Sequence, residues 1–398
     1  MENNRRNFIK QTASLAACLS IGDIGEDSLT GSSFAEKSKD KKVTWPVTEG
    51  GDTPKIILNS SANASQANMR LIKQFGVDYV LMGGPQLPWT ESRLREILDR
   101  FKAEGLSVIN MMLPTISDII YARSGRGEQI KNVQDSLIAA GKAGLPVVEY
   151  NFYAHRLTEG YYNVVGRGGS QYLAFDYKRK MENPADNKWT YPKTRSNEEL
   201  GLSPQELQSK SNTGTFTKEQ LWDNITHFLK AVIPVAEKAG VRMALHPNDP
   251  PVPLSRGSQQ IMASFNDWKR LLNIVNSPSN GMTFDCSVSN EIGEDPLAVL
   301  HYLADRDRIN HVHFRNCLIE VPSTKYVEVF PDQGSVNMFA VMRALVRRKY
   351  KYGLFAEHPR GNDLDQKIGS DFAGYLFNLA HARGIMQSVL TLQQEGKL

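Results

Sequence analysis

Four short apolar runs of the sequence each end at a side chain that could bind a metal ion: His246, Asp285, His313 and Glu357. The prolines at 247, 250, 251 and 253 have a fixed φ and no backbone N–H, so a strand must stop at His246 and hold that side chain in one place. A single histidine at a strand end is usually structural, but four such coincidences favour a site. Imidazole and carboxylate ligands together suit Mn²⁺, Fe²⁺, Co²⁺ or Zn²⁺ and suit Mg²⁺ less well. The residue types therefore predict a divalent-metal centre.

A fifth candidate, His311, lies two positions before His313. Because side chains alternate with a period of two along a strand, both histidines fall on the same face, and parity cannot separate them. His313 is nearer the carboxyl end of the run, so we take it as the ligand. His311 is then a core residue or a neighbour of the ligands.

Eight apolar runs alternate with helical patterns from Lys55 onward. The expected strands are residues 56–59, 78–82, 107–112, 147–152, 242–246, 282–285, 309–314 and 352–357. The helical patterns at 91–104, 129–143 and 218–239 each end at a glycine, which suits a left-handed C-cap. Eight strand–helix repeats favour a closed (β/α)8 TIM barrel, an α/β fold. The candidate ligands end strands five to eight, so we expect them to meet at the barrel mouth, where active sites of such barrels lie.

The segments outside the repeats divide the chain. Residues 153–217, after strand four, have weak periodicity and are expected to form a lid-like insertion or a substrate loop. Residues 36–52 are rich in Lys, Asp, Ser and Gly and indicate a linker. The predicted organisation is a signal segment at 1–35, a linker at 36–52 and one barrel domain at 53–398.

The N-terminus resembles a twin-arginine (Tat) export signal. Asn-Arg-Arg-Asn-Phe-Ile-Lys at 4–10 precedes a mildly apolar stretch at 12–22, and Ser-Phe-Ala at 33–35 offers a cleavage site. This pattern predicts transport by the Tat translocase to the periplasm. The alternative is a lipoprotein signal in which Cys18 is lipidated, but only seven residues separate Lys10 from Cys18, which is short for an apolar core.

Composition excludes several classes of protein. The net charge of +4 over 398 residues and the lack of a basic stripe interleaved with aromatic residues give no support for nucleic-acid binding. No other stretch approaches the length of a transmembrane span. Three cysteines, none in a Cys-x-x-Cys pair, cannot form a disulfide framework. These features are typical of a soluble enzyme, and a homo-oligomer remains compatible with them.

From about Lys55 to Met386 the chain resembles the D-mannonate dehydratase family, a divalent-metal branch of the xylose-isomerase-like barrels. The matching segments are His-Pro-Asn-Asp-Pro-Pro at 246–251, Asn-Gly-Met-Thr-Phe at 280–284, His-Phe-Arg-Asn at 313–316, Gly-Ser-Val-Asn-Met at 334–338, Gly-Tyr at 374–375 and Ala-Arg-Gly-Ile at 382–385, with 149–152 and 169–175 around the insertion. The resemblance implies a catalytic metal on His246, Asp285, His313 and Glu357.

Several positions depart from the family pattern. Asp285 stands where the family usually has a metal-binding cysteine, Glu357 stands where it has an aspartate, and Glu149 stands where a neutral residue is common. Carboxylates harden the site toward Mn²⁺ or Mg²⁺, and we expect Mn²⁺ or Fe²⁺ as the cofactor. The acidic ligands are closer to sugar isomerases and epimerases of the wider superfamily. A metal-dependent isomerase, epimerase or lyase is therefore an alternative, and a non-catalytic sugar-binding protein is a second one.

The resemblance implies dehydration of D-mannonate, a sugar acid, to 2-keto-3-deoxy-D-gluconate. A metal bound to the carboxylate and the adjacent hydroxyl would acidify the C2 proton, while a general acid protonates the departing C3 hydroxyl. His358 is the first candidate for proton transfer, and Tyr150 is a further catalytic candidate. Arg315 could hold the substrate carboxylate bidentately, or it could form a salt bridge that closes the barrel mouth. The expected substrate-binding residues are Asn151, His155, Arg156, Asn248 and Asp249.

Overall fold

The computed structural model describes residues 43–47, 49–156, 160–179, 215–255, 257–369 and 371–398. The predicted signal at 1–35, the first part of the predicted linker and residues 180–214 of the predicted insertion lie outside these ranges.

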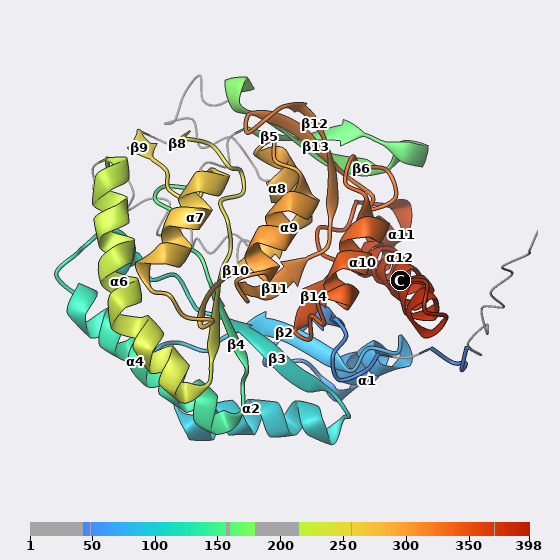
Figure 1. The fold of residues 1–398 in the computed structure, drawn as a ribbon, viewed down its shortest axis with the longest axis horizontal. Helices are drawn as coiled ribbons and strands as arrows, with labels where there is room; N and C mark the ends of the chain where they lie inside the picture. Colours follow the sequence, from blue (N-terminus) through green and yellow to red (C-terminus); the bar gives the residue numbers. More distant parts are fainter. Residues whose placement is uncertain (1–42, 48, 157–159, 180–214, 256, 370) are drawn as a thin grey trace, which may run out of the picture. The chain divides into compact units, whose positions relative to one another are not determined.

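Eight parallel strands form a closed barrel in the order β1-β14-β11-β10-β7-β4-β3-β2 (Figure 1). Their bounds are β1 Lys55–Asn59, β2 Tyr79–Gly83, β3 Ser107–Met112, β4 Val147–Tyr150, β7 Arg242–Leu245, β10 Asn280–Asp285, β11 Ile309–His313 and β14 Gly353–Phe355. The TIM-barrel prediction is confirmed.

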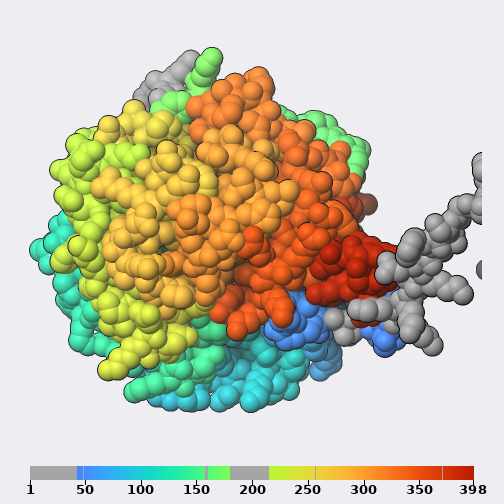
Figure 2. Space-filling view, viewed as in Figure 1, coloured from blue at the N-terminus to red at the C-terminus, as the bar shows by residue number. Residues whose placement is uncertain are grey.

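Helices surround the barrel. The longer ones are α1 Gln66–Gln74, α2 Glu91–Ala103, α4 Arg126–Ala143, α6 Lys218–Ala239, α7 Phe265–Ile274, α9 Pro296–Ala304, α10 Met338–Arg347 and α12 Phe372–Gln394; α3 Ser117–Ile120, α8 Cys286–Glu291 and α11 Asp363–Ile368 are short. On the face shown in Figure 2, α6, α7 and α9 cover the strands. As predicted, α4 and α6 end at glycines in the left-handed conformation, Gly144 and Gly240.

The strand period of two separates the outer core from the barrel interior. On β10, Met282 and Phe284 belong to the hydrophobic core, while the alternate residue Thr283 donates a hydrogen bond to the interior residue Glu149. Every residue of β10 is buried, because helices cover the outer face of a parallel barrel. The same alternation directs Asp285 toward the interior at the end of the strand.

A second, antiparallel sheet combines two segments that are distant in sequence. Its strands are β5 Tyr161–Val165, β6 Gln171–Asp176, β12 Asn316–Val321 and β13 Lys325–Val329, in the order β12-β13-β6-β5, and it lies at the upper edge of Figure 1. β5 and β6 belong to the predicted insertion, whereas the β12–β13 hairpin directly follows β11. A small hairpin of β8 Leu254–Ser255 and β9 Ser258–Gln259 follows β7. The pairings β5–β6, β12–β13 and β8–β9 were not predicted from the sequence.

Several segment ends differ from the prediction. Strand β4 ends at Tyr150 rather than at residue 152, and β14 ends at Phe355 rather than at Glu357. Part of the predicted linker packs on the barrel, because Val47 is only 3% exposed and belongs to the main core. Among the described residues, no helix is long and apolar enough to cross a membrane.

Candidate metal centre

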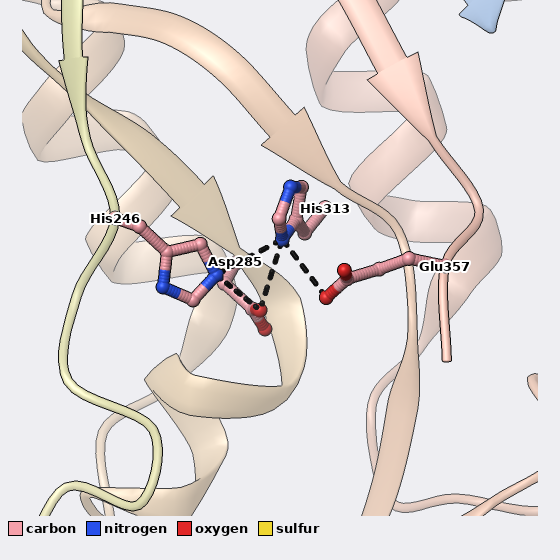
Figure 3. Close-up of side chains that lie close together, drawn as sticks. All are labelled: His246, Asp285, His313 and Glu357. Carbon is pink, nitrogen blue, oxygen red and sulfur yellow. Dashed lines mark hydrogen bonds and ion pairs between the residues drawn. The ribbon is translucent and has the colours of Figure 1, made fainter. Parts of the chain in front are cut away.

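The structure brings together the four residues that the sequence predicts as metal ligands (Figure 3). Asp285 and His313 end β10 and β11, His246 follows β7 directly, and Glu357 lies two residues beyond β14. His246 Nε2 lies 3.0 Å from His313 Nδ1 and 3.7 Å from Asp285 Oδ2. His313 Nδ1 lies 2.8 Å from Glu357 Oε1 and 3.6 Å from Asp285 Oδ2.

These spacings suit a single ion. One ligand atom from each residue lies within 4.8 Å of the other three. Neighbouring ligand atoms at about 2.1 Å from one metal are about 3.0 to 3.4 Å apart, which is close to the distances observed between the four side chains. Two imidazole nitrogens and two carboxylate oxygens therefore form a donor set with the spacing of a mononuclear site.

The orientations of two of these side chains also fit a cation. His246 Nδ1 lies 2.6 Å from the carbonyl oxygen of Pro247, which only a protonated nitrogen can satisfy, so the lone pair of Nε2 faces the cluster. Glu357 Oε1 is buried and has three nitrogens within 3.3 Å, but none is aligned to form a hydrogen bond with it. A metal ion would satisfy this oxygen.

The electrostatics of the cluster favour a positive charge. Burial lowers the pKa of His313, but Glu357, Asp285 and Glu149 outweigh that effect and raise the pKa to about 10. Burial raises the pKa of Glu357, but His313, His358 and Arg315 outweigh it and hold the pKa well below its usual range. The carboxylates therefore stay ionised and stabilise a cation at the position of the shared atoms.

Arg315 does not have the free guanidinium that binding a substrate carboxylate would require. It is 2% exposed, and its Nε lies 2.8 Å from Asp285 Oδ2 and 3.1 Å from Glu357 Oε1. Its terminal nitrogens lie 3.0 Å from Asp249 and 3.2 Å from Glu291. These contacts do not support the expected substrate contact, which stays a prediction. Arg315 instead forms the salt-bridge network that the sequence analysis gave as the alternative, and it holds the two carboxylate ligands.

Asp249 and Asn248 were expected to bind substrate, but both are internal. Asp249 Oδ1 accepts hydrogen bonds from Tyr161 at 2.6 Å and Tyr326 at 3.0 Å, so Asp249 joins the second sheet to Arg315. The Asn248 side-chain amide lies 3.4 Å from Gln260 Oε1, and its residue is 2% exposed. These contacts assign both residues to the framework behind the cluster.

The expected substrate residues after β4 also make protein contacts. His155 Nδ1 lies 2.8 Å from the hydroxyl of Ser258 in β9. Arg156 donates to the carbonyl of Asp249 at 2.8 Å, and the Asn151 amide points at Met112 Sδ at 3.8 Å. The structure does not bring these three side chains into the ligand cluster. Tyr153 lies behind one candidate ligand, because its hydroxyl is 3.3 Å from His246 Nδ1, the ring nitrogen that faces away from the cluster, and donates to the carbonyl of Pro247 at 2.9 Å.

Tyr150 points away from the mouth, so its position does not support the catalytic role expected for it. Its ring packs edge-on against Phe228 of α6, with 5.7 Å between ring centroids. Its hydroxyl is buried and has no hydrogen-bond partner among the described residues. Since neighbours on a strand face opposite sides, Glu149 points into the barrel and Tyr150 points out of it.

Glu149 lies beneath the cluster, and the sequence analysis did not include it in the site. It accepts hydrogen bonds from Thr283 at 2.7 Å and Asn110 at 3.1 Å. Its oxygens lie 3.6 Å from His313 Nε2 and 4.0 Å from His311 Nε2. His311 is therefore beside Glu149, whereas His313 Nδ1 reaches the ligand cluster. A charged residue within an apolar strand was the available signal for Glu149.

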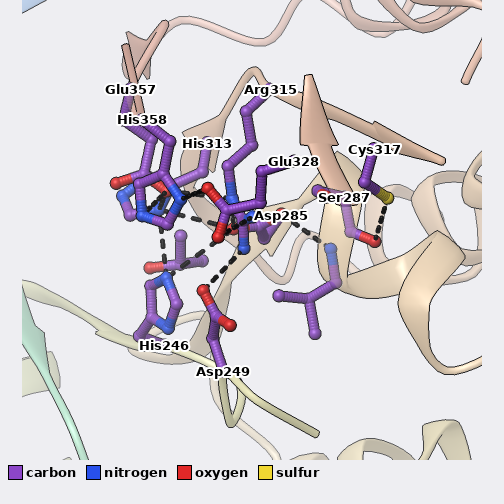
Figure 4. Close-up of polar contacts among 12 residues, drawn as sticks. His246, Asp249, Asp285, Ser287, His313, Arg315, Cys317, Glu328, Glu357 and His358 are labelled. Carbon is purple, nitrogen blue, oxygen red and sulfur yellow. Dashed lines mark hydrogen bonds and ion pairs between the residues drawn. The ribbon is translucent and has the colours of Figure 1, made fainter. Parts of the chain in front are cut away.

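His358 lies at the edge of the cluster because the strand has already ended. Its Nε2 is 3.3 Å from Glu357 Oε1, and its Nδ1 is 2.7 Å from Glu328 Oε2 (Figure 4). Its backbone has φ of +49°, so the chain turns between Glu357 and His358 and both side chains reach one site. Glu328 was not predicted, because nothing in its local sequence in β13 distinguishes it from a surface glutamate.

Comparisons with known proteins agree with this architecture. The family model described as D-mannonate dehydratase (UxuA) matches residues 61–396. The mannonate dehydratase of Enterococcus faecalis is 31% identical over 286 residues, which cover 68% of this chain and 78% of the relative. The mannonate dehydratase of Streptococcus equi subsp. zooepidemicus is 30% identical over 279 residues, or 68% and 75% of the two chains. The crystal structure of mannonate dehydratase from Streptococcus suis superposes with a TM-score of 0.72 at 24% identity, over 86% of this chain and 96% of that chain.

Proposed function

Because this chain belongs to the D-mannonate dehydratase family, we propose that it removes water from D-mannonate and forms 2-keto-3-deoxy-D-gluconate. The observation that carries the proposal is the convergence of His246, Asp285, His313 and Glu357 at the barrel mouth, within a chain that matches the family model over residues 61–396. The enzyme is then a carbon–oxygen lyase.

The family is metal-dependent, and we propose Mn²⁺ or Fe²⁺ as the ion in this chain. Two imidazole ligands favour a transition metal over Mg²⁺. Two carboxylate ligands favour a harder ion than the one a site with a thiolate ligand would select. When bound, such an ion supplies a Lewis acid for the substrate's carboxylate and 2-hydroxyl, which acidifies the proton on C2. Arg315 keeps Asp285 and Glu357 ionised and in place for it.

We assign proton transfer to His358. Its Nε2 points toward the ligand cluster and lies 3.3 Å from Glu357 Oε1. A substrate bound at a metal in this cluster would be within reach of that nitrogen. Imidazole can take the proton from C2 and give a proton to the departing C3 hydroxyl, since its usual pKa lies near neutrality. The proton and the hydroxide together leave as one water molecule.

Turnover of D-mannonate tests this function. The purified protein is stripped of metal with a chelator, divided into samples with Mn²⁺, Fe²⁺, Zn²⁺ or no ion, and assayed for a 2-keto-3-deoxy acid. We expect activity with Mn²⁺ or Fe²⁺ and none without metal. A panel of aldoses and ketoses is assayed in parallel. Isomerisation or epimerisation of a neutral sugar without dehydration of D-mannonate would replace the proposal with the isomerase alternative, and sugar binding without turnover would support a binding protein.

We also propose that the precursor is exported to the periplasm by the Tat translocase. The support is the Arg5-Arg6 motif and the apolar stretch that follows it. Transport in the folded state would let the protein acquire its metal before it crosses the membrane.

A further inference from the structure

Glu328 and His358 are neighbours in space although they come from different parts of the fold. Glu328 lies on β13, whose backbone pairs with β6, and His358 lies in the turn after β14. Glu328 Oε2 is 2.7 Å from His358 Nδ1 (Figure 4). A carboxylate can only accept a hydrogen bond, so this contact places the proton of a neutral His358 on Nδ1. The lone pair of Nε2 then faces the ligand cluster.

Arg360 ties this pair together. Its terminal nitrogen donates to Glu328 Oε2 at 2.7 Å and to the backbone carbonyl of His358 at 2.7 Å, and its Nε donates to the same carbonyl at 3.0 Å. One guanidinium therefore holds both the carboxylate and the peptide that carries the imidazole. Glu328 and Arg360 are 1% and 3% exposed, so solvent competes little with these contacts.

We propose that Glu328 is a positioning residue for His358: it fixes the tautomer and ring orientation that present Nε2 to the substrate. The proposal rests on the role of His358 in the function proposed above. When Nε2 takes the C2 proton, His358 becomes a cation, and the adjacent carboxylate stabilises that charge until the proton leaves with the C3 hydroxyl as water. The second sheet thus supplies part of the proton-transfer machinery.

A purely structural role would give different results. Glu328 also lies in the interface between the hairpin and the turn at 357–361, so a disruptive substitution could lower activity by displacing Glu357. Gln is nearly the same shape as Glu and can still accept from Nδ1, but it lacks the charge. Glu328→Gln therefore separates charge from packing, and metal content together with thermal unfolding shows whether the site is intact.

The test combines Glu328→Gln, His358→Asn and the double variant in the metal-loaded enzyme. We expect Glu328→Gln to lower kcat by about 10- to 100-fold while KM and metal content stay within about threefold. Glu328 Oε1 also lies 3.8 Å from Arg315, so the double variant tests the route of the effect. If Glu328 acts through His358, the double variant should have the kcat of His358→Asn alone. Glu320→Gln, an exposed change on the neighbouring β12, is the matched control and should leave kcat unchanged. Wild-type kcat in Glu328→Gln, or multiplicative losses in the double variant, would overturn the proposal.

A second measurement keeps this inference separate from the proposed function. ¹⁵N NMR of the histidine rings reports the tautomer of His358, whose signal is identified by its loss in His358→Asn. We expect the Nδ1–H form in the wild type and a shift toward a mixture of forms in Glu328→Gln. An unchanged spectrum would refute the positioning role even if D-mannonate is turned over. If D-mannonate is not a substrate but the spectrum changes, the function fails and the positioning by Glu328 stands.

Discussion

His246 is a candidate ligand, and its replacement tests whether activity depends on the metal. His246→Ala removes one of the two imidazoles and leaves three candidate ligands. Replacing a residue that only supports a ligand typically costs about 10- to 100-fold in metal affinity, so we expect the loss here to exceed about 100-fold. Activity should be lost in parallel. Metal content after dialysis and turnover are measured on the same sample, with the exposed His227→Ala on α6 as control. Full metal content in His246→Ala would remove this residue from the ligand set.

Glu149 lies outside the cluster of four candidate ligands, and we expect it to act on that cluster through its charge. Its carboxylate lies 3.6 Å from the ring nitrogen of His313 that faces away from the cluster, and it stabilises positive charge on that ring. Glu149→Gln retains a side-chain oxygen that can accept from Thr283 but loses the charge, so we expect metal affinity to fall by about tenfold. Competition with a chelator measures it. Unchanged affinity would show that the barrel interior screens this carboxylate from the site.

Tyr150 should be dispensable for catalysis. Its hydroxyl is buried without a hydrogen-bond partner among the described residues. Burial raises the pKa of Tyr150, so the hydroxyl stays neutral. Tyr150→Phe keeps the packing against Phe228 and removes an unsatisfied polar group. We expect kcat within about twofold of wild type and equal or higher thermal stability. A large loss of kcat with unchanged stability would return Tyr150 to the list of catalytic candidates.

At the scale of elements, α12 braces the turn that carries Glu357. Asn378 donates hydrogen bonds to the carbonyl oxygens of Glu357 at 2.8 Å and Ala356 at 3.3 Å. Gly374 lies against the same turn, where an added Cβ would come within 2.7 Å of Pro359 Cβ and 3.0 Å of the carbonyl oxygen of Arg360. The helix therefore fixes the position of the fourth candidate ligand.

Gly374→Ala tests this support. The added methyl must displace the turn at Pro359, and a shift of about 1 Å at a catalytic group can cost about 100-fold in rate, so we expect lower kcat and weaker metal binding. Gly384→Ala on the same helix is the control, since no atom outside its own helix backbone lies within 4 Å of that Cβ. That change should leave activity intact and stabilise the fold by about 0.5 to 1 kcal/mol. Equal activity of the two variants would show that the turn adapts freely.

At the scale of the whole molecule, barrel closure gathers the site. The strands that carry the four candidate ligands are adjacent in the order β14-β11-β10-β7, so their carboxyl ends meet on one side of the mouth. Two connections between barrel strands then build a shared sheet, in which β13 pairs with β6 of the insertion after β4. The site therefore depends on the insertion as well as on the barrel.

Export is the prediction that concerns the complete chain. Replacing both Arg5 and Arg6 by Lys should trap the precursor in the cytoplasm, because the Tat translocase reads the arginine pair. Cell fractionation followed by immunodetection measures the distribution, and a variant with Lys41 and Lys42 of the expected linker replaced by Arg serves as a control. A normal periplasmic yield from the double Lys variant would refute the Tat assignment.

The sequence by itself determined the barrel and the residues at the ends of its last strands. Apolar runs, glycine caps and the prolines after His246 are local signals, because the backbone and the nearest neighbours decide where a strand or a helix ends. Eight strand–helix repeats predicted a closed barrel, and the local signals then placed the candidate ligands at its mouth, at His246, Asp285, His313 and Glu357. Strand boundaries were less certain, since β4 ends at Tyr150, two residues before the predicted end. Alternation along β4 turns Tyr150 outward beside the inward-facing Glu149, which the sequence analysis had not applied to this candidate.

Only the tertiary structure decided what surrounds those four residues. The hydrogen-bond partners of Arg315 lie 24 to 66 positions away in sequence. Glu328 meets His358 through a hairpin that pairs with an insertion from the other half of the barrel. No local pattern encodes such contacts, since they depend on how the connections fold over the mouth. The burial of the charged side chains was also visible only in the structure. A carboxylate on a strand can face solvent, a cationic side chain or a metal, and the local sequence does not distinguish these cases.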